Sequence, residues 1–278
     1  KKIKNIETIK NTLKYIVLIG ILIIVLFPIF WVISTSFKLP NDFYSSPPVW
    51  IPSEITFDHY YKLFTTYRAS PYIINSIIIA SGVTILVMLL TIPAAYSMSR
   101  YRIGGKKLPF WILSFRMLPP VAVVIPLFLL FIQLKLIDTY IGLILSYLVF
   151  HIPFAIWLLI SFFKDIPPEL HESAMIDGCT EVGAMLKIIL PLISPGIVVV
   201  SLFTFIFTWN DLVLVLTLSR GRTKTLMLLI ASTMQSPTGI FFGVAAASAA
   251  IGIIPVFLIT LFLQRYLVKG LTLGGVKG

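Results

Sequence analysis

Long apolar runs limit what this chain can fold into. Crossing the roughly 30 Å hydrocarbon core of a bilayer takes about 20 residues of α-helix, and runs of about that length or longer recur along the sequence. In lipid, unbroken segments of this kind satisfy their backbone polar groups only as helices. We predict an all-α integral membrane protein, one transmembrane domain over residues 1–278, with six spans at about 13–37, 71–97, 108–133, 140–163, 188–218 and 240–264.

The charged residues lie mostly between these runs. The chain is 58% hydrophobic and 12% charged, about half the charge of a soluble domain. A net charge of +11 is compatible with nucleic-acid binding, but charges in short segments beside spans are typical of topology determination. We therefore expect contact with membrane lipid and no nucleic-acid partner.

Lysines and arginines also predict the orientation. If the N-terminus is inside the cell, the inner segments hold twice as many of them as the outer segments. The positive-inside rule then places both termini in the cytoplasm of a multi-pass protein of the cell (plasma or inner) membrane. The segment 164–187 and the tail 265–278 would be cytoplasmic too.

Nothing in the sequence predicts a catalytic or metal site. Cys179 is the only cysteine, and metal-ligand spacing is absent from the three histidines, His59, His151 and His171. The only lysine followed by a hydroxyl residue is Lys224, and Thr223 precedes it where a phosphate-binding loop has glycine. We expect no enzyme and no cofactor in this chain; if ATP is used, another chain binds it.

The most polar interruption of the apolar sequence is the segment 164–187. It contains five of the eleven acidic residues: Asp165, Glu169, Glu172, Asp177 and Glu181. Pro167 and Pro168 suit a helix entrance, and Gly178 is placed to end that helix in a left-handed conformation. Thr180 can cap a second helix, which would continue into the fifth span and bend near Pro191 and Pro195.

The same segment carries a resemblance. Glu172-Ser173-Ala174, then Gly178, then Ile188-x-Leu190-Pro191 resembles the EAA signature, E-A-A-x3-G-x9-I-x-L-P, of ABC importer permease subunits, with Ser173 in place of the first alanine. Fragments elsewhere resemble the second permease of maltose-type carbohydrate-uptake systems. They are Arg116-Met117-Leu118-Pro119-Pro120, Leu136-Ile137-Asp138-Thr139, Trp209-Asn210-Asp211 and Gly270-Leu271-Thr272-x-Gly274-Gly275-Val276-Lys277-Gly278.

This resemblance implies a type I importer permease fold and a set of partners. They are a second homologous permease, two ABC ATPase subunits that bind ATP and Mg, and an extracytoplasmic substrate-binding protein. A short coupling helix would dock in the ATPase and transmit its closure to the spans. The implied coupling residues are Glu169, Leu170, Glu172, Ser173, Ala174, Met175, Ile176, Asp177, Gly178, Ile188, Leu190 and Pro191, and the implied tail contacts with the ATPase are Gly275 and Lys277.

Three polar residues are candidates for the transport pathway. Arg116 lies about eight residues into the third span, where a charge usually faces a cavity or a partner, or else its side chain reaches back to the cytoplasmic headgroups. Asn210 and Asp211 lie late in the fifth span and either line an outward cavity or mark the end of the span. We expect His151 to be a hydrogen-bonded helix contact rather than a ligand.

Two functional classes remain. The leading hypothesis is the permease subunit of an ATP-driven ABC importer that moves a sugar inward by alternating access. The alternative is a secondary transporter or channel acting alone, which predicts ionisable residues deep in the spans. A third possibility keeps the ABC machinery but changes the solute to peptides, phosphate or polyamines.

Overall fold

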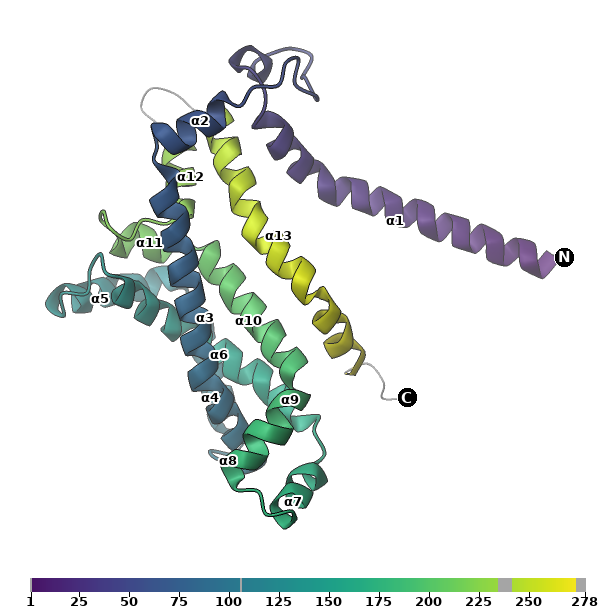
Figure 1. The fold of residues 1–278 in the computed structure, drawn as a ribbon, viewed down its shortest axis with the longest axis vertical. Helices are drawn as coiled ribbons and strands as arrows, with labels where there is room; N and C mark the ends of the chain where they lie inside the picture. Colours follow the sequence, from purple (N-terminus) through teal and green to yellow (C-terminus); the bar gives the residue numbers. More distant parts are fainter. Residues whose placement is uncertain (1, 106, 235–241, 274–278) are drawn as a thin grey trace. The chain divides into compact units, whose positions relative to one another are not determined.

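The computed structural model describes residues 2–105, 107–234 and 242–273, and side chains within 11–264 of that range. No strand occurs in these residues. The helices of Figure 1 are α1 (Lys2–Thr35), α2 (Asp58–Thr65), α3 (Ala69–Arg100), α4 (Lys107–Ser114), α5 (Pro120–Gln133), α6 (Tyr140–Lys164), α7 (Pro168–Ile176), α8 (Glu181–Ala184), α9 (Leu190–Leu192), α10 (Ser194–Trp209), α11 (Val213–Leu218), α12 (Leu226–Met234) and α13 (Phe242–Leu273). Short 3₁₀ turns are η1 (Pro40–Phe43) and η2 (Phe115–Met117), and η3 (Met185–Ile189) is a π-helical turn.

Four predicted spans are single long helices. The first, second, fourth and sixth apolar runs coincide with α1, α3, α6 and α13, each long and apolar enough to cross a membrane. Pro28, Pro93, Pro153 and Pro255 lie inside these helices without ending them. The sequence therefore located four long apolar helices, each a candidate span.

The third and fifth runs are bent pairs of helices. In the third run, α4 with η2 meets α5 at 89°, with the break at Leu118 and Pro119. In the fifth run, the segment from α8 to α9 meets α10 at 75°. This bend lies beside Pro195 and Pro191, as expected, because proline removes a backbone donor and crowds the preceding turn. The described residues thus contain four candidate spans, or up to six if each bent pair is one span.

The expectation about the C-terminal end of the fifth run is wrong. The span does not continue to residue 218, because α10 ends at Trp209 and a separate short helix, α11, follows. A further helix, α12, forms between the fifth and sixth predicted spans. Asn210 caps α10 with a backbone bond to Ile206, and Asp211 accepts from the Leu214 N–H at the start of α11.

The contacts divide the chain into two units. One contains Lys1–Ala69 and Ile230–Ile253. Within it, His59 is buried against the Lys38 carbonyl, 2.8 Å from Nε2, and a Cβ at Gly243 would collide with the same imidazole. Lys38 is buried with Nζ 3.8 Å from the Trp31 ring centroid. In α1, residues 11–30 are all exposed, although the Phe27 ring lies 5.5 Å from the Trp50 ring, centroid to centroid.

The other unit contains Ser70–Leu229 and Ile254–Gly278, and its core forms around α6. This helix packs against α10, α11, α4 and α5. Gly196 allows close approach of α10, because a Cβ there would collide with the Phe162 ring. At one end of this unit, α7 and α8 lie beside the C-terminal end of α3, low in Figure 1.

Asp138 joins two turns of the second unit. Its carboxylate accepts the backbone N–H groups of four consecutive residues, 220–223, and the Thr223 hydroxyl. Partial burial alone would raise the pKa of Asp138, but these backbone hydrogen bonds outweigh it and hold the pKa well below its usual value. The charged carboxylate therefore organises the turn that leads to α12.

Candidate functional site

The α7–α8 hairpin is a compact unit with both helix ends satisfied. α7 begins at Pro168, and Gly178 adopts φ +85° immediately after its C-cap residue, Asp177. The Cys179 N–H bonds to the Ala174 carbonyl at 3.0 Å and the Gly178 N–H to the Met175 carbonyl at 3.1 Å, which is the Schellman pattern. The hairpin expected from the sequence is therefore confirmed, including its left-handed glycine.

The second helix of the hairpin is capped as expected. The Thr180 hydroxyl accepts the Gly183 N–H at 3.1 Å. α8 then continues through η3 and α9 toward α10. The chain direction after Gly178 is thus fixed by two successive caps, and the hairpin connects directly to the fifth span.

A polar cluster ties the hairpin to α3. Arg100 Nη2 lies 3.2 Å from His171 Nδ1 and 3.2 Å from Glu172 Oε1. Because a guanidinium is only a donor, Nδ1 must accept, and Nε2 then donates to Glu181 Oε2 at 2.9 Å. Tyr101 donates to the same carboxylate, and this bond raises the pKa of Tyr101 above its usual range. His171 is buried, so its ring is fixed by partners from both α3 and α8.

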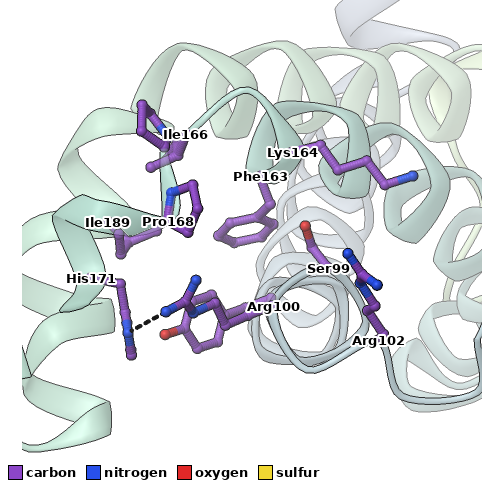
Figure 2. A pocket seen from close by; sticks show the side chains of 11 residues that line it. Ser99, Arg100, Arg102, Phe163, Lys164, Ile166, Pro168, His171 and Ile189 are labelled. Atoms are coloured by element: carbon purple, nitrogen blue, oxygen red, sulfur yellow. Dashed lines mark hydrogen bonds between the residues drawn. The ribbon is translucent and has the colours of Figure 1, made fainter.

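A pocket of about 270 Å³ lies where α7 meets the ends of α3 and α6. Figure 2 shows Arg100 reaching toward His171, with Phe163 and Pro168 beside them and Ser99, Arg102 and Lys164 at the other side. Its lining combines the basic residues Arg100, Arg102 and Lys164 with apolar side chains such as Phe163 and Ile189. The pocket marks the joint between the hairpin and the spans.

One side of α7 packs against the protein and the other is free. His171 and Ala174 are buried, whereas Leu170, Met175 and Ile176 are exposed, Ile176 to 86%. Glu169 and Ser173 are exposed as well. An exposed apolar surface of this kind on a short, rigid helix is typical of a protein-binding surface.

The other predicted coupling residues lie in two places. Glu172 is 64% exposed and its carboxylate pairs with Arg100 of the same chain, a partner the sequence did not indicate. Ile188 and Leu190 lie in η3 and α9, where they pack against the core. Pro191 is exposed in α9. The residues of the EAA-like signature therefore do not form one cluster. Some lie on the hairpin and others lie where the chain continues into the fifth span.

A second site is a cavity of about 470 Å³ that brings together all three predicted pathway residues. Arg116, Asn210 and Asp211 line it, although they come from η2 and from the turn after α10. Its other lining residues are Leu118, Pro120, Tyr147, Phe150, His151, Phe207 and Leu214. Asn210 and Asp211 thus follow the end of α10 and also line a cavity.

Hydrogen bonds orient the polar groups of this cavity. Arg116 Nη1 donates to the Phe150 carbonyl at 3.1 Å, and its guanidinium lies 5.5 Å from both the Phe154 and Phe207 ring centroids. Asp211 Oδ2 accepts from the Tyr147 hydroxyl and from the Leu214 N–H, both at 3.0 Å. Arg116 is therefore held by the protein beside the cavity.

His151 is a helix contact, as expected. Its Nε2 lies 3.1 Å from Thr208 Oγ1. The Thr208 hydroxyl donates its one proton to the Thr204 carbonyl, so Nε2 carries the hydrogen and donates. Buried Nδ1 of His151 then has no hydrogen-bond partner within the described residues.

Some site residues were missed and others cannot be placed. His171, Arg100 and Tyr101 were not predicted, because their contacts join positions 71 to 80 residues apart and leave no local pattern. The expected tail contacts, Gly275 and Lys277, lie outside the described residues.

Comparison with known proteins identifies the chain. Residues 88–273 match the family described as binding-protein-dependent transport system inner membrane component. The trehalose transport system permease protein SugB of Mycobacterium tuberculosis is 38% identical over 260 residues, which cover 91% of this chain and 93% of that protein. The trehalose/maltose transport system permease protein MalG of Thermococcus litoralis is 34% identical over 276 residues, which cover 98% of this chain and 99% of that protein.

A solved structure shares the fold. It is a crystal structure of a bacterial ABC transporter involved in the import of the acidic polysaccharide alginate; one chain superposes with a TM-score of 0.79 at 22% identity, covering 94% of this chain and 97% of that chain. The family match and the relatives favour an importer permease over a transporter or channel that acts alone. The chain belongs to the family of binding-protein-dependent transport system inner membrane components, the permease subunits of ABC importers.

Proposed function

We propose that this chain is the permease subunit through which an ABC importer moves a sugar into the cytoplasm, and that the α7–α8 hairpin couples it to a separate ATPase. The observation that carries the coupling role is the two-sided nature of α7. One side is anchored to α3 through His171, and the other presents Leu170, Met175 and Ile176 to solvent. Saccharide transport is supported by the relatives named for trehalose and maltose.

The contacts that anchor the hairpin would allow a displacement of α7 to be transmitted to the spans. A hairpin capped at both helix ends moves as a body rather than bending, and it is tied to α3 by Arg100 and Tyr101 and to α10 by continuous chain. Closure of the ATPase would displace α7, and α3 and α10 would follow, so that the pathway changes its accessible side. Arg116, Asn210 and Asp211 would line that pathway.

The assembly we propose contains this chain, a second homologous permease, two ATPase subunits that bind ATP and Mg, and an extracytoplasmic binding protein. We further propose six spans with both termini cytoplasmic. Four long helices and two bent pairs support this count, and the family supports the ATPase and the binding protein as partners.

Copurification and uptake together test the coupling role. Ile176→Asp places a charge on the most exposed apolar side chain of α7, and we expect it to abolish ATPase copurification and uptake of labelled trehalose and maltose in cells expressing the whole system. Ile51→Asp is the matched control, because Ile51 is 74% exposed but lies in the segment we place outside the cell. Retention of the ATPase by Ile176→Asp would refute the role of this surface.

A further inference from the structure

The cavity at Arg116 contains two opposite charges that are not paired with each other. Among the ion pairs of the described residues, none includes Arg116 or Asp211. Arg116 donates one N–H to the Phe150 carbonyl, and its other N–H groups remain available as donors. Asp211 accepts from two donors at one oxygen, which suits an ionised carboxylate. A charge in a membrane-spanning region is costly unless it has a partner, so both groups favour a polar ligand in the cavity that they line.

The cavity also offers an aromatic surface. Phe207 lines it, is 40% exposed, and lies in the last turns of α10, close to Asn210. Asn210 is exposed, and its amide nitrogen bonds to the Ile206 carbonyl, which leaves the amide oxygen available. A ring face beside a few donors and acceptors matches the two surfaces of a pyranose, whose C–H groups are apolar and whose hydroxyls both donate and accept.

The balance of charge decides the class of ligand. A uronate or a sulfonated sugar would be attracted by Arg116 but repelled by Asp211. A cationic solute would be attracted by Asp211 but repelled by Arg116. A neutral saccharide can accept from the guanidinium and donate to the carboxylate at the same time. The cavity volume of about 470 Å³ is large enough for one or two sugar rings.

We propose that this chain itself holds a subsite for a neutral saccharide, with Phe207 as the stacking surface and Arg116, Asp211 and Asn210 as hydrogen-bonding groups. The inference rests on the proposed transport of a sugar and adds two things to it. The subsite lies on this permease, and it discriminates against charged sugars.

The test measures sugar binding to the transporter without its binding protein. The complex of both permeases and the ATPase is placed in nanodiscs and titrated with trehalose, maltose and a glucuronic-acid-containing disaccharide, with saturation-transfer NMR as the readout. We expect the neutral disaccharides to bind more tightly than the uronate. Phe207→Leu should weaken their binding roughly two- to tenfold, the range expected for loss of an aromatic contact.

Phe203→Leu is the matched control. Phe203 lies one turn earlier on α10, is 39% exposed and contacts Phe207, but it does not line the cavity. This variant should bind both neutral disaccharides like the wild type. Equal binding by Phe207→Leu and the wild type would overturn the proposal, because the sugar would then sit elsewhere in the complex.

Asp211→Asn gives an independent test. It keeps an acceptor oxygen for the Tyr147 hydroxyl but removes the negative charge, so the uronate should gain affinity relative to maltose. A wild-type preference for the uronate, an unchanged selectivity in Asp211→Asn, or no binding of any disaccharide would each refute the subsite. Energised uptake of trehalose or maltose by the whole system would still support the proposed function in those cases, whereas loss of uptake would refute that function itself.

Discussion

Replacement of Gly178 should impair coupling in proportion to the cost of its backbone conformation. Gly178 has φ +85°, and a Cβ added there would have no heavy atom within 4 Å. A substitution therefore creates no clash and acts only through the backbone. This makes the position a clean probe of whether the capped hairpin geometry is needed for transport.

The size of the effect follows from the conformation. A non-glycine residue in the left-handed region costs about 1–2 kcal/mol, asparagine costs less, and a β-branched residue such as valine costs more. A cost of 1–2 kcal/mol reduces the ratio of capped to uncapped hairpin roughly 5- to 30-fold. We expect transport to fall in the order glycine, asparagine, alanine, valine, with Gly178→Val inactive.

The assay is uptake of labelled trehalose or maltose by the whole system, with membrane insertion and ATPase copurification measured on the same preparations. All variants should insert, because the spans do not include Gly178. Equal transport by all variants would refute the requirement for a left-handed turn. Inactivity of Gly178→Asn as complete as that of Gly178→Val would show that something other than backbone conformation matters.

Three further predictions concern other contacts. Glu172→Lys should abolish transport while the protein still inserts, since it sets a second positive charge against Arg100; Glu172→Gln should change stability by no more than about 1 kcal/mol, as for an exposed ion pair, and normal uptake by Glu172→Lys would contradict the coupling role. Asp138→Ala leaves the four N–H groups of residues 220–223 without their acceptor and should cost about 1–3 kcal/mol, measured as a lower Tm in detergent. Because the folded pKa of Asp138 is depressed, its stabilisation should be complete above the unfolded value of about 3.9 and decline only as the pH falls below it; an equal Tm for the variant at pH 7 would refute this. In a Cys179→Ser background, an impermeant maleimide applied to intact cells should label Tyr44→Cys and not Ile176→Cys, both at highly exposed positions, and the opposite labelling would overturn the orientation.

The sequence by itself determined the elements whose causes are local. Apolar length predicted the four long helices, because spanning a bilayer depends on the number of consecutive apolar residues. Pro168, Gly178 and Thr180 predicted the ends of the hairpin helices, because a helix start and a left-handed stop depend on single residues and their neighbours. The spacing of Glu172, Gly178 and Pro191 identified the family.

The tertiary structure alone decided what joins distant positions. The sequence placed a bend near Pro191 and Pro195 but gave no reason for the bends of 89° and 75°, which depend on packing against neighbouring helices. It did not separate α11 from the fifth span, because α11 is apolar and resembles a continuation of that span, and it placed no helix where α12 forms between the fifth and sixth spans.

The two sites show the same division. Arg116, Asn210 and Asp211 were recognised as costly polar residues in apolar surroundings, but nothing in their spacing says that they share a cavity with Phe207. His171 was set aside because it had no neighbouring ligand in the sequence. Its partners, from α3 and α8, come together only when the chain folds, because hydrogen bonds depend on distance in space and leave no periodic trace in the sequence.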